Sequence, residues 1–200
     1  ISLTAGSTYD WMLDSPTPYQ GSSYGVGNYA VLNPLSSGSA SLSSANLTFT
    51  QSSAAWINAI SSFFISSGKW YLEITCATTN AMLVGIVDPS YNGLTTSTIG
   101  YTSSSYGYNA ASGSKINNSS VGSYGATYTN GDVIGVALDM DSGTITFYKN
   151  NVSQGVAYST ILTTSSSYAI AISLYNSGSA YANFGQRPFA YTPPSGYKSL

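Results

Sequence analysis

The sequence predicts a single all-β domain, either a sandwich or a closed barrel, and three observations favour this fold. Runs of β-branched and aromatic residues recur at a spacing of roughly ten residues, separated by clusters of Ser, Gly, Asn and Asp. No stretch sustains the 3.6-residue apolar period of an amphipathic helix. The length of 200 residues suits one domain, or one domain with an arm, and allows a normal hydrophobic core.

Residues 1–28 are predicted to form an N-terminal arm or linker. The segment has an apolar anchor around Trp11, followed by a Ser- and Gly-rich stretch in which Pro16 and Pro18 argue against a helix. Residues 21–25 of that stretch fit the G-x-S-x-G pattern of hydrolases. That pattern needs a histidine base, and the chain has no histidine, so we assign no catalysis to it.

The domain itself is predicted from residue 29 to residue 190. In chain order the predicted strands cover residues 28–32, 39–42, 46–50, 63–66, 69–78, 81–87, 99–102, 106–110, 126–130, 132–140, 144–150, 168–175 and 180–185. Only residues 54–64 (AAWINAISSFF) could hold a helical turn. Many short strands with almost no helix indicate a sandwich or barrel.

The clearest element is a hairpin over residues 131–151. In its second strand Ile145 and Phe147 share one face, while Thr144, Thr146 and Tyr148 take the other, which is the period-two pattern of a half-buried strand. The preceding Asp-Ser-Gly provides the reversal, because aspartate bonds nearby backbone and glycine tolerates positive φ. So short a break requires antiparallel neighbours.

The composition excludes several classes of function. Only 6% of the residues are charged and the net charge is -2, so the scattered basic residues form no patch for nucleic acid or for a membrane surface. No apolar run approaches the ~20 residues of a spanning helix. The single cysteine, Cys76, is predicted to be buried beside Leu72 and Ile74 and weakly favours assembly in a reducing cytosol.

The acidic residues also argue against an enzyme. Glycosidases need two carboxyl groups about 5–10 Å apart. The one glutamate, Glu73, alternates with Leu72 and Ile74 and is expected to brace a neighbouring strand, whereas Asp132 after glycine is expected to form a turn. We therefore predict no catalytic residues, no metal and no cofactor.

Several segments in a fixed order resemble the SPRY domain, the core of the B30.2 family. They are SSGKWYLEIT (66–75), MLVGIVD (82–88), YGYN (106–109), GDVIGVALDMDSGTITFYKNNVSQGVAY (131–158), YAIAISLY (168–175) and ANFGQRPF (182–189). Tyr106 and Tyr108 stand where the family more often has tryptophan, and Asn151 where it has glycine. Asparagine also tolerates positive φ, so the fold is not threatened.

This resemblance implies a bent sandwich of two antiparallel sheets that binds peptides or proteins with loops at one edge and has neither catalytic residues nor a cofactor. It implies that Asp139 is a structural group that bonds loop backbone. It also implies a set of core residues, namely Trp70, Leu72, Leu138, Phe147, Phe184 and Phe189.

A second, looser resemblance concerns the setting of the domain. The low charge, the Ser, Gly, Asn and Tyr content and the flanking segments are similar to those of SPRY domains embedded in bacteriophage virion proteins. This likeness implies a position on the virion surface, as a tail fibre or surface projection assembled in the host cytoplasm, within a larger homo-oligomeric assembly. The start at Ile1 and the end on PPSGYKSL indicate a processed chain or a segment, with residues 191–200 as a C-terminal extension.

Three functions follow as alternatives. The first is recognition of a host-surface glycan or protein, the second a purely structural decoration or connector contacting neighbouring subunits, and the third a polysaccharide-degrading enzyme, which the missing bases disfavour. For the first, loops 88–98 and 175–181 have the Tyr, Ser, Gly and Asn content of binding loops. The predicted contact residues are Tyr91, Asn92, Tyr101 and Tyr175.

Overall fold

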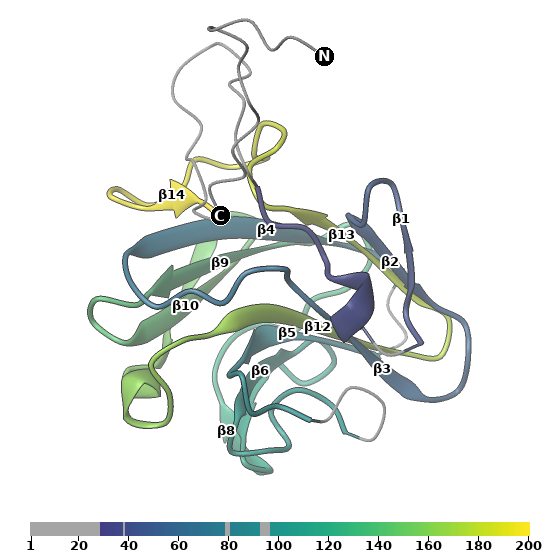
Figure 1. Cartoon of the computed structure of the whole chain (residues 1–200), viewed down its shortest axis with the longest axis horizontal. Coiled ribbons are helices and arrows are strands. Elements are labelled where there is room, and N and C mark those ends of the chain that lie inside the picture. Colours follow the sequence, from purple (N-terminus) through teal and green to yellow (C-terminus); the bar gives the residue numbers. More distant parts are fainter. Residues whose placement is uncertain (1–28, 38, 79–80, 93–96) are drawn as a thin grey trace, which may run out of the picture.

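Two β-sheets stacked face to face make up the domain (Figure 1). The computed structural model describes residues 29–37, 39–78, 81–92 and 97–200. The predicted arm (1–28) and the G-x-S-x-G segment lie outside the described residues. Within the described part the only helices are two 3-10 turns, η1 (Pro34–Ser36) and η2 (Ile161–Thr163), so the prediction of an all-β sandwich is confirmed.

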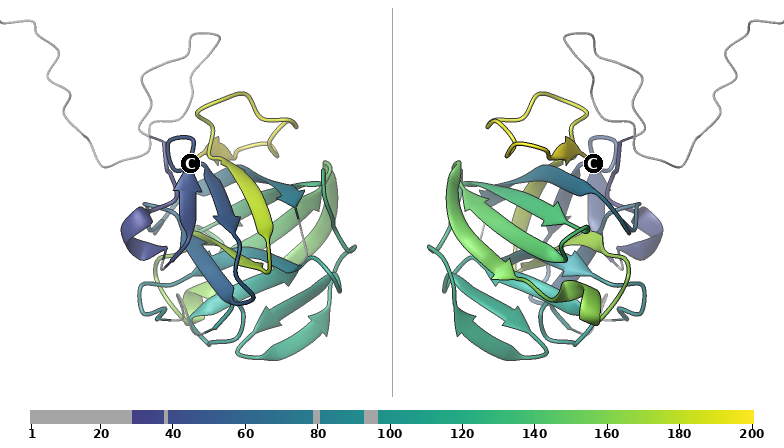
Figure 2. Two further views of the ribbon diagram at one scale, coloured as in Figure 1. Left: turned by 90° about the vertical axis from the view of Figure 1, so that its right-hand side faces the viewer. Right: turned by 90° about the vertical axis from the view of Figure 1, so that its left-hand side faces the viewer.

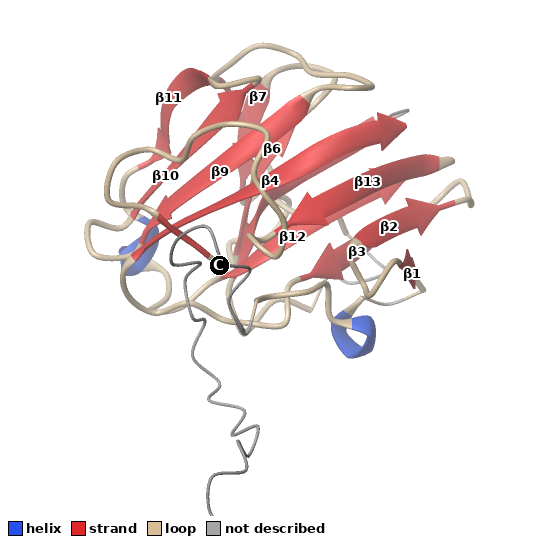
Figure 3. Ribbon diagram, turned by 90° about the horizontal axis from the view of Figure 1, so that it is seen from above, coloured by secondary structure: helices blue, strands red, loops and turns tan. Residues whose placement is uncertain are grey.

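The strands of the larger sheet do not lie in the order in which they follow one another along the chain. Across it lie β1 (Ser41–Ser43), β2 (Thr48–Gln51), β13 (Gly178–Asn183), β4 (Lys69–Thr78), β9 (Val133–Asp139), β10 (Thr144–Lys149) and β11 (Val152–Tyr158). Figure 3 shows these strands from above. The short β14 (Lys198–Ser199) pairs in parallel with β4, whereas the other pairings among described strands are antiparallel.

The smaller sheet faces the larger one across the core. Its order is β3 (Trp56–Ile60), β12 (Ala169–Tyr175), β5 (Ala81–Val87), β6 (Ser105–Asn109), β7 (Ser114–Asn117) and β8 (Ser120–Ser123). Figure 2 shows the two curved sheets from two opposite sides, each view turned by 90° from that of Figure 1.

The predicted central hairpin is confirmed as β9 and β10. Ile145 pairs with Leu138 and Phe147 with Val136, which places these four apolar side chains on the inner face. The turn contains Gly143 at φ +69°, a backbone conformation that glycine adopts without steric cost. Asp139 accepts hydrogen bonds from two backbone N–H groups of the turn, as the family resemblance implies.

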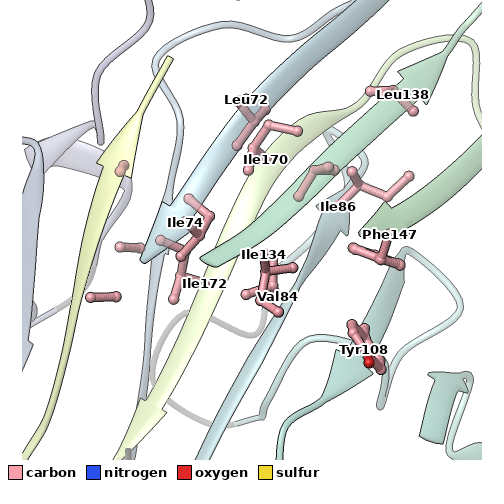
Figure 4. Packing of buried hydrophobic residues seen from close by; sticks show 14 of the residues in the cluster. Leu72, Ile74, Val84, Ile86, Tyr108, Ile134, Leu138, Phe147, Ile170 and Ile172 are labelled. Carbon is pink, nitrogen blue, oxygen red and sulfur yellow. The ribbon is translucent and has the colours of Figure 1, made fainter. Parts of the chain in front are cut away.

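Apolar side chains from both sheets fill the space between them (Figure 4). Leu72, Ile74 and Ile134 come from the larger sheet and meet residues such as Val84 and Ile170 of the smaller one. Because successive side chains of a strand point to opposite faces, every second residue of β4, β5 and β12 belongs to this core. The predicted burial of Leu72, Cys76, Leu138, Phe147 and Phe184 is confirmed.

Two predicted core residues are placed differently. Trp70 packs against the core cluster, as predicted, but is only half-buried, and its indole N–H donates to the carbonyl of Ser67 at 2.7 Å. Phe189 lies on the outer face of the larger sheet, where its ring meets Tyr71 edge-on with centroids 5.1 Å apart. The apolar character of the two residues was recognised from the sequence, but their depth and side of the sheet were not.

Several strand predictions are wrong. Residues 56–60, for which a helical turn was considered, form β3, and residues 99–102 and 126–130 are not strands. The polar strands β7 and β8, and β11, were not predicted. In this hairpin only Ile116 is buried, so neither β7 nor β8 needs a row of apolar residues, and the sequence shows no apolar alternation there.

The C-terminal segment packs against the outer face of the larger sheet. The carboxylate of Glu73, on β4, accepts the backbone N–H groups of Ala190 at 2.7 Å and Tyr191 at 2.9 Å, and the hydroxyl of Tyr71 at 3.2 Å. Glu73 therefore braces this segment and not a neighbouring strand, which corrects the prediction. At the very end Leu200 is buried and its carbonyl accepts the N–H of Ala30.

Candidate functional site

The two loops predicted to bind leave opposite ends of the smaller sheet. β5 ends at Val87, which lies opposite Ala169, whereas β12 ends at Tyr175, which lies opposite Ala81. The loop after β5 and the turn after β12 therefore do not meet as two neighbouring tips, contrary to the prediction. The loop after β5 instead folds back across the outer face of the sheet, where Ile99 packs in a cluster with Ile60, Leu83 and Ala171.

A buried polar network fastens this loop to the sheet. On β3 the side-chain amide of Asn58 donates to the hydroxyl of Tyr91 at 3.1 Å and to the carbonyl of Ser97 at 2.7 Å. On β12 the hydroxyl of Ser173 donates to the Asn58 side-chain oxygen and accepts the N–H of Ile99 at 3.1 Å. These side chains share one face because Asn58 and Ser173 are register partners. The network fixes where the loop crosses the sheet.

Tyr91 is part of this network and not an exposed contact residue. Only 8% of it is exposed, and its hydroxyl also donates to the carbonyl of Ser97 at 3.2 Å. Burial raises the pKa of its phenol well above the usual range. The prediction that Tyr91 contacts a ligand is therefore corrected: the side chain holds the loop in place. The next residue, Asn92, is exposed.

Tyr175 is paired with a second aromatic residue that the sequence analysis did not single out. Trp56 lies opposite Tyr175 in the register of β3 and β12, and their ring centroids are 5.3 Å apart at an interplanar angle of 41°. Both side chains are half-buried. We call this pair the Trp56–Tyr175 platform. Trp56 could have been found from the alternation of Trp56, Asn58 and Ile60, had residues 54–64 been interpreted as a strand.

A recess opens at one end of the sandwich, between residues of the two sheets. It has a volume of about 340 Å³ and is lined by Ala81, Ala110, Ala111, Thr127, Tyr128, Thr129 and Lys149. Ala81 is the register partner of Tyr175, but Tyr128 belongs to the core cluster between the sheets and Lys149 to β10, so the recess does not lie on the outer face that carries the platform. The ammonium group of Lys149 already contacts the Asp132 carboxylate at 3.2 Å and donates to the Thr127 carbonyl at 2.9 Å. The recess therefore presents small and hydroxyl-bearing side chains and a neutralised cation.

Tyr101 lies apart from the platform. It is 48% exposed, and its carbonyl accepts the hydroxyl of Ser119 in the turn between β7 and β8 at 3.1 Å. In the sheet order, β5 and β6 separate that hairpin from β12. With strands about 4.8 Å apart, the two sites are separated by roughly 15 Å or more. The structure thus brings Tyr175 and Trp56 together and leaves Tyr101 elsewhere.

The acidic side chains have structural partners. Asp139 forms an ion pair with Lys69 at 2.9 Å, and Asp132 accepts the N–H of Thr129 and the side-chain amide of Asn150. Burial alone would raise the pKa of Asp132, but these hydrogen bonds and Lys149 outweigh it and hold the pKa below its usual value. No three His, Cys, Asp or Glu residues gather as metal ligands in the described ranges.

Comparison with known proteins gives a consistent picture. A family model for the SPRY domain matches residues 69–187. The chain is 32% identical over 152 residues to the E3 ubiquitin-protein ligase RKP of Arabidopsis thaliana, a match over 75% of this chain and 12% of that protein. It is 35% identical over 94 residues to the Ran-binding proteins 9/10 homolog of Drosophila melanogaster, over 46% of this chain and 10% of the relative. The chain thus spans only about a tenth of the length of these relatives.

A solved structure supports the same fold. The SPRY domain of human HERC1 superimposes with a TM-score of 0.67, at 19% sequence identity, over 76% of this chain and 96% of that domain. Separately, no helix among the described residues has the length and apolar character to cross a membrane.

Proposed function

The chain belongs to the SPRY domain family, and we propose that it is a non-catalytic recognition module that binds its ligand on the Trp56–Tyr175 platform. SPRY domains generally act as protein–protein interaction modules. The finer proposal is that the ligand is a host-surface protein or glycan whose apolar group or sugar ring packs on the two aromatic rings.

One observation carries this proposal: two half-buried aromatic rings lie together on the outer face of the smaller sheet. Trp and Tyr provide large, rigid contact area and are enriched among the residues that dominate binding energies. The network of Asn58, Ser173 and Tyr91 fixes the neighbouring loop before any ligand arrives. Such preorganisation lowers the entropy cost of binding.

The carboxylates support a binding role over a catalytic one. Both oxygens of Glu73 accept hydrogen bonds from the chain itself, and Asp132 and Asp139 are each paired with a lysine. A general base must be able to reach the proton that it removes. Carboxylates held by several internal donors are poorly placed for that task.

We further propose a virion surface as the setting, with assembly in the host cytoplasm. The support is compositional: 6% charged residues and an abundance of Ser, Gly, Asn and Tyr. The relatives named above are eukaryotic, and this part of the proposal rests on composition alone. In that setting the alternative occupant of the platform is a neighbouring subunit of the virion, which would make the domain a connector.

A parallel screen separates these alternatives. The purified domain is panned against a random peptide library and applied to a glycan array, with the Trp56→Ala variant in both experiments. Peptides or glycans that bind the wild type and not the variant would support recognition at the platform. If the domain retains no peptide and no glycan above background, the connector function is favoured and the recognition proposal fails.

A further inference from the structure

The last strand of the smaller sheet, β8, has an open edge. The turn between β7 and β8 consists of Asn118 and Ser119, both at positive φ (50° and 61°), as in a two-residue hairpin turn. In such a hairpin Ser120 and Gly122 exchange hydrogen bonds with β7, so the N–H and C=O groups of Val121 and Ser123 point away from it. Among the described residues no hydrogen bond satisfies these outward groups.

At β11, an edge strand of the larger sheet, side chains bind the outward backbone groups. Along β11, side chains of the neighbouring hairpin and loop occupy outward carbonyls: Tyr124 donates to Gly155 at 2.6 Å and Lys115 to Ala157 at 2.7 Å. Proteins commonly block exposed strand edges, because an open edge pairs with other chains. Of these two edges, β8, at the bottom of Figure 1, is the one whose outward backbone groups no described residue occupies.

The hairpin that carries β8 is held in place. The N–H of Asn118 donates to the carbonyl of Thr102 at 3.2 Å, and that of Ser119 to Gly100 at 3.1 Å. The side-chain amide of Asn117 donates to the carbonyl of Ser105 at 2.8 Å. A strand that is already ordered loses little entropy when it accepts a partner.

Gly122 lies within β8, and no described neighbour requires glycine at this position. Its φ is not positive, and a Cβ built there would meet its nearest atom, the Cε of Lys115, at 3.7 Å, an ordinary contact. Glycine weakens a strand and often marks a place where another backbone approaches closely. Among the described residues no backbone comes that close to Gly122.

We propose that β8 pairs antiparallel with β8 of a second copy of the chain, about a two-fold axis at Gly122. Val121 then lies opposite the second copy's Ser123 and exchanges backbone hydrogen bonds with it, and the symmetry repeats this on the other side of the axis. The two Gly122 residues face each other at the close, non-hydrogen-bonded position, with Cα atoms about 4.5 Å apart.

The chemistry of β8 suits a second copy. Residues 120–123 (SVGS) carry no charge, so two copies meet without repulsion, and Val121 is 61% exposed and offers apolar surface beside the axis. The nearest cation, Lys115, is engaged by the carbonyl of Ala157 and the ring of Tyr158. Four residues bury too little area for a permanent dimer, so the association is reversible and depends on concentration.

Sedimentation equilibrium over a wide concentration series tests the proposal. We expect the wild type to shift from monomer toward dimer, and Val121→Lys to lower the association constant by about tenfold or more, because a lysine on each copy blocks the edge. The matched control is Val152→Lys, an equally exposed valine of β11 (64% against 61%), which should associate like the wild type.

Val121→Pro provides a second variant, since it removes only an outward N–H and leaves the bonds to β7 intact. Melting temperatures confirm that each variant folds. A wild type that stays monomeric at every concentration would overturn the proposal. So would equal association constants for Val121→Lys and Val152→Lys.

Discussion

Trp56 and Tyr175 lie two register rows away from Asn58 and Ser173, so the aromatic platform and the buried polar network occupy the same face of the same two strands. The aromatic row faces outward and stays half-exposed, whereas the polar row is covered by the loop after β5. The same sheet face thus both anchors a loop and presents a surface.

The first prediction concerns Tyr91. Tyr91→Ala should lower the free energy of unfolding by about 3 kcal/mol, because a buried aromatic ring is removed. Tyr91→Phe should lower the free energy of unfolding by about 1–2 kcal/mol, because it removes the hydroxyl that accepts a hydrogen bond from the side-chain amide of Asn58. Urea denaturation measures both. Equal stability of Tyr91→Ala and wild type would show that Tyr91 is a loop-surface residue after all.

Glu73 is the basis of the second prediction. Glu73→Gln replaces one acceptor oxygen by an amide group that faces a backbone N–H, and should destabilise the protein by about 1–3 kcal/mol. Hydrogen exchange should become faster at the amides of Ala190 and Tyr191. Unchanged exchange at these two amides would mean that the carboxylate does not hold the C-terminal segment.

The third prediction is a pH dependence. Burial by itself would raise the pKa of Asp139, but the hydrogen bond from Lys69 and the N–H groups of Ser142 and Asp141 outweigh it, so the pKa lies below its ordinary value of 3.8. A carboxyl group whose pKa is lower in the folded state stabilises the protein above its unfolded pKa, and this contribution is lost as the pH falls through the folded value.

We therefore expect stability to decrease as the pH is lowered below about 4, and to decrease less steeply in Asp139→Asn. Thermal unfolding of both proteins between neutral and strongly acidic pH provides the comparison. Asp132, whose pKa is also lowered, contributes to the slope that remains. Parallel curves for wild type and variant would contradict the assignment.

The fourth prediction concerns the thiol of Cys76. Burial, with a smaller effect of Asp132, raises its pKa to about 12. At pH 8 the reactive thiolate is then on the order of one molecule in ten thousand, and the thiol is covered by the core. Modification by a thiol reagent should follow the rate of unfolding. Rapid modification of the folded protein would show that Cys76 is accessible.

The sequence was sufficient for elements with a strong apolar pattern. In β4, β5, β12 and the β9–β10 hairpin, alternating or continuous apolar residues predict both the strand and its buried face, as the burial of Leu72, Ile86 and Phe147 confirms. β7 and β8 were not predicted, because their hairpin is mostly polar. Its turn consists of Asn118 and Ser119 and contains no glycine that would indicate a turn. A strand that depends on hydrogen bonding to its neighbours carries little signal of its own.

The candidate site was predicted only in part, for a similar reason. Composition identified Tyr175 and Tyr91 as residues of interest, but whether a loop tyrosine is buried depends on where the loop crosses the sheet. That crossing is set by Asn58 and Ser173, which are 115 positions apart in the chain. Local patterns do not encode such a contact, so the exposure of Tyr91 was wrongly predicted and Trp56 was overlooked.

The measurement that tests the central claim most directly compares Trp56→Ala with Tyr101→Ala in binding to one peptide or glycan selected by the wild-type domain. Both variants remove one aromatic side chain, but only Trp56 belongs to the platform. With folding verified by melting temperature, isothermal titration should show an affinity loss of about tenfold or more for Trp56→Ala, corresponding to roughly 1–3 kcal/mol, and almost none for Tyr101→Ala. Wild-type affinity in Trp56→Ala, or a larger loss in Tyr101→Ala, would contradict recognition at the Trp56–Tyr175 platform.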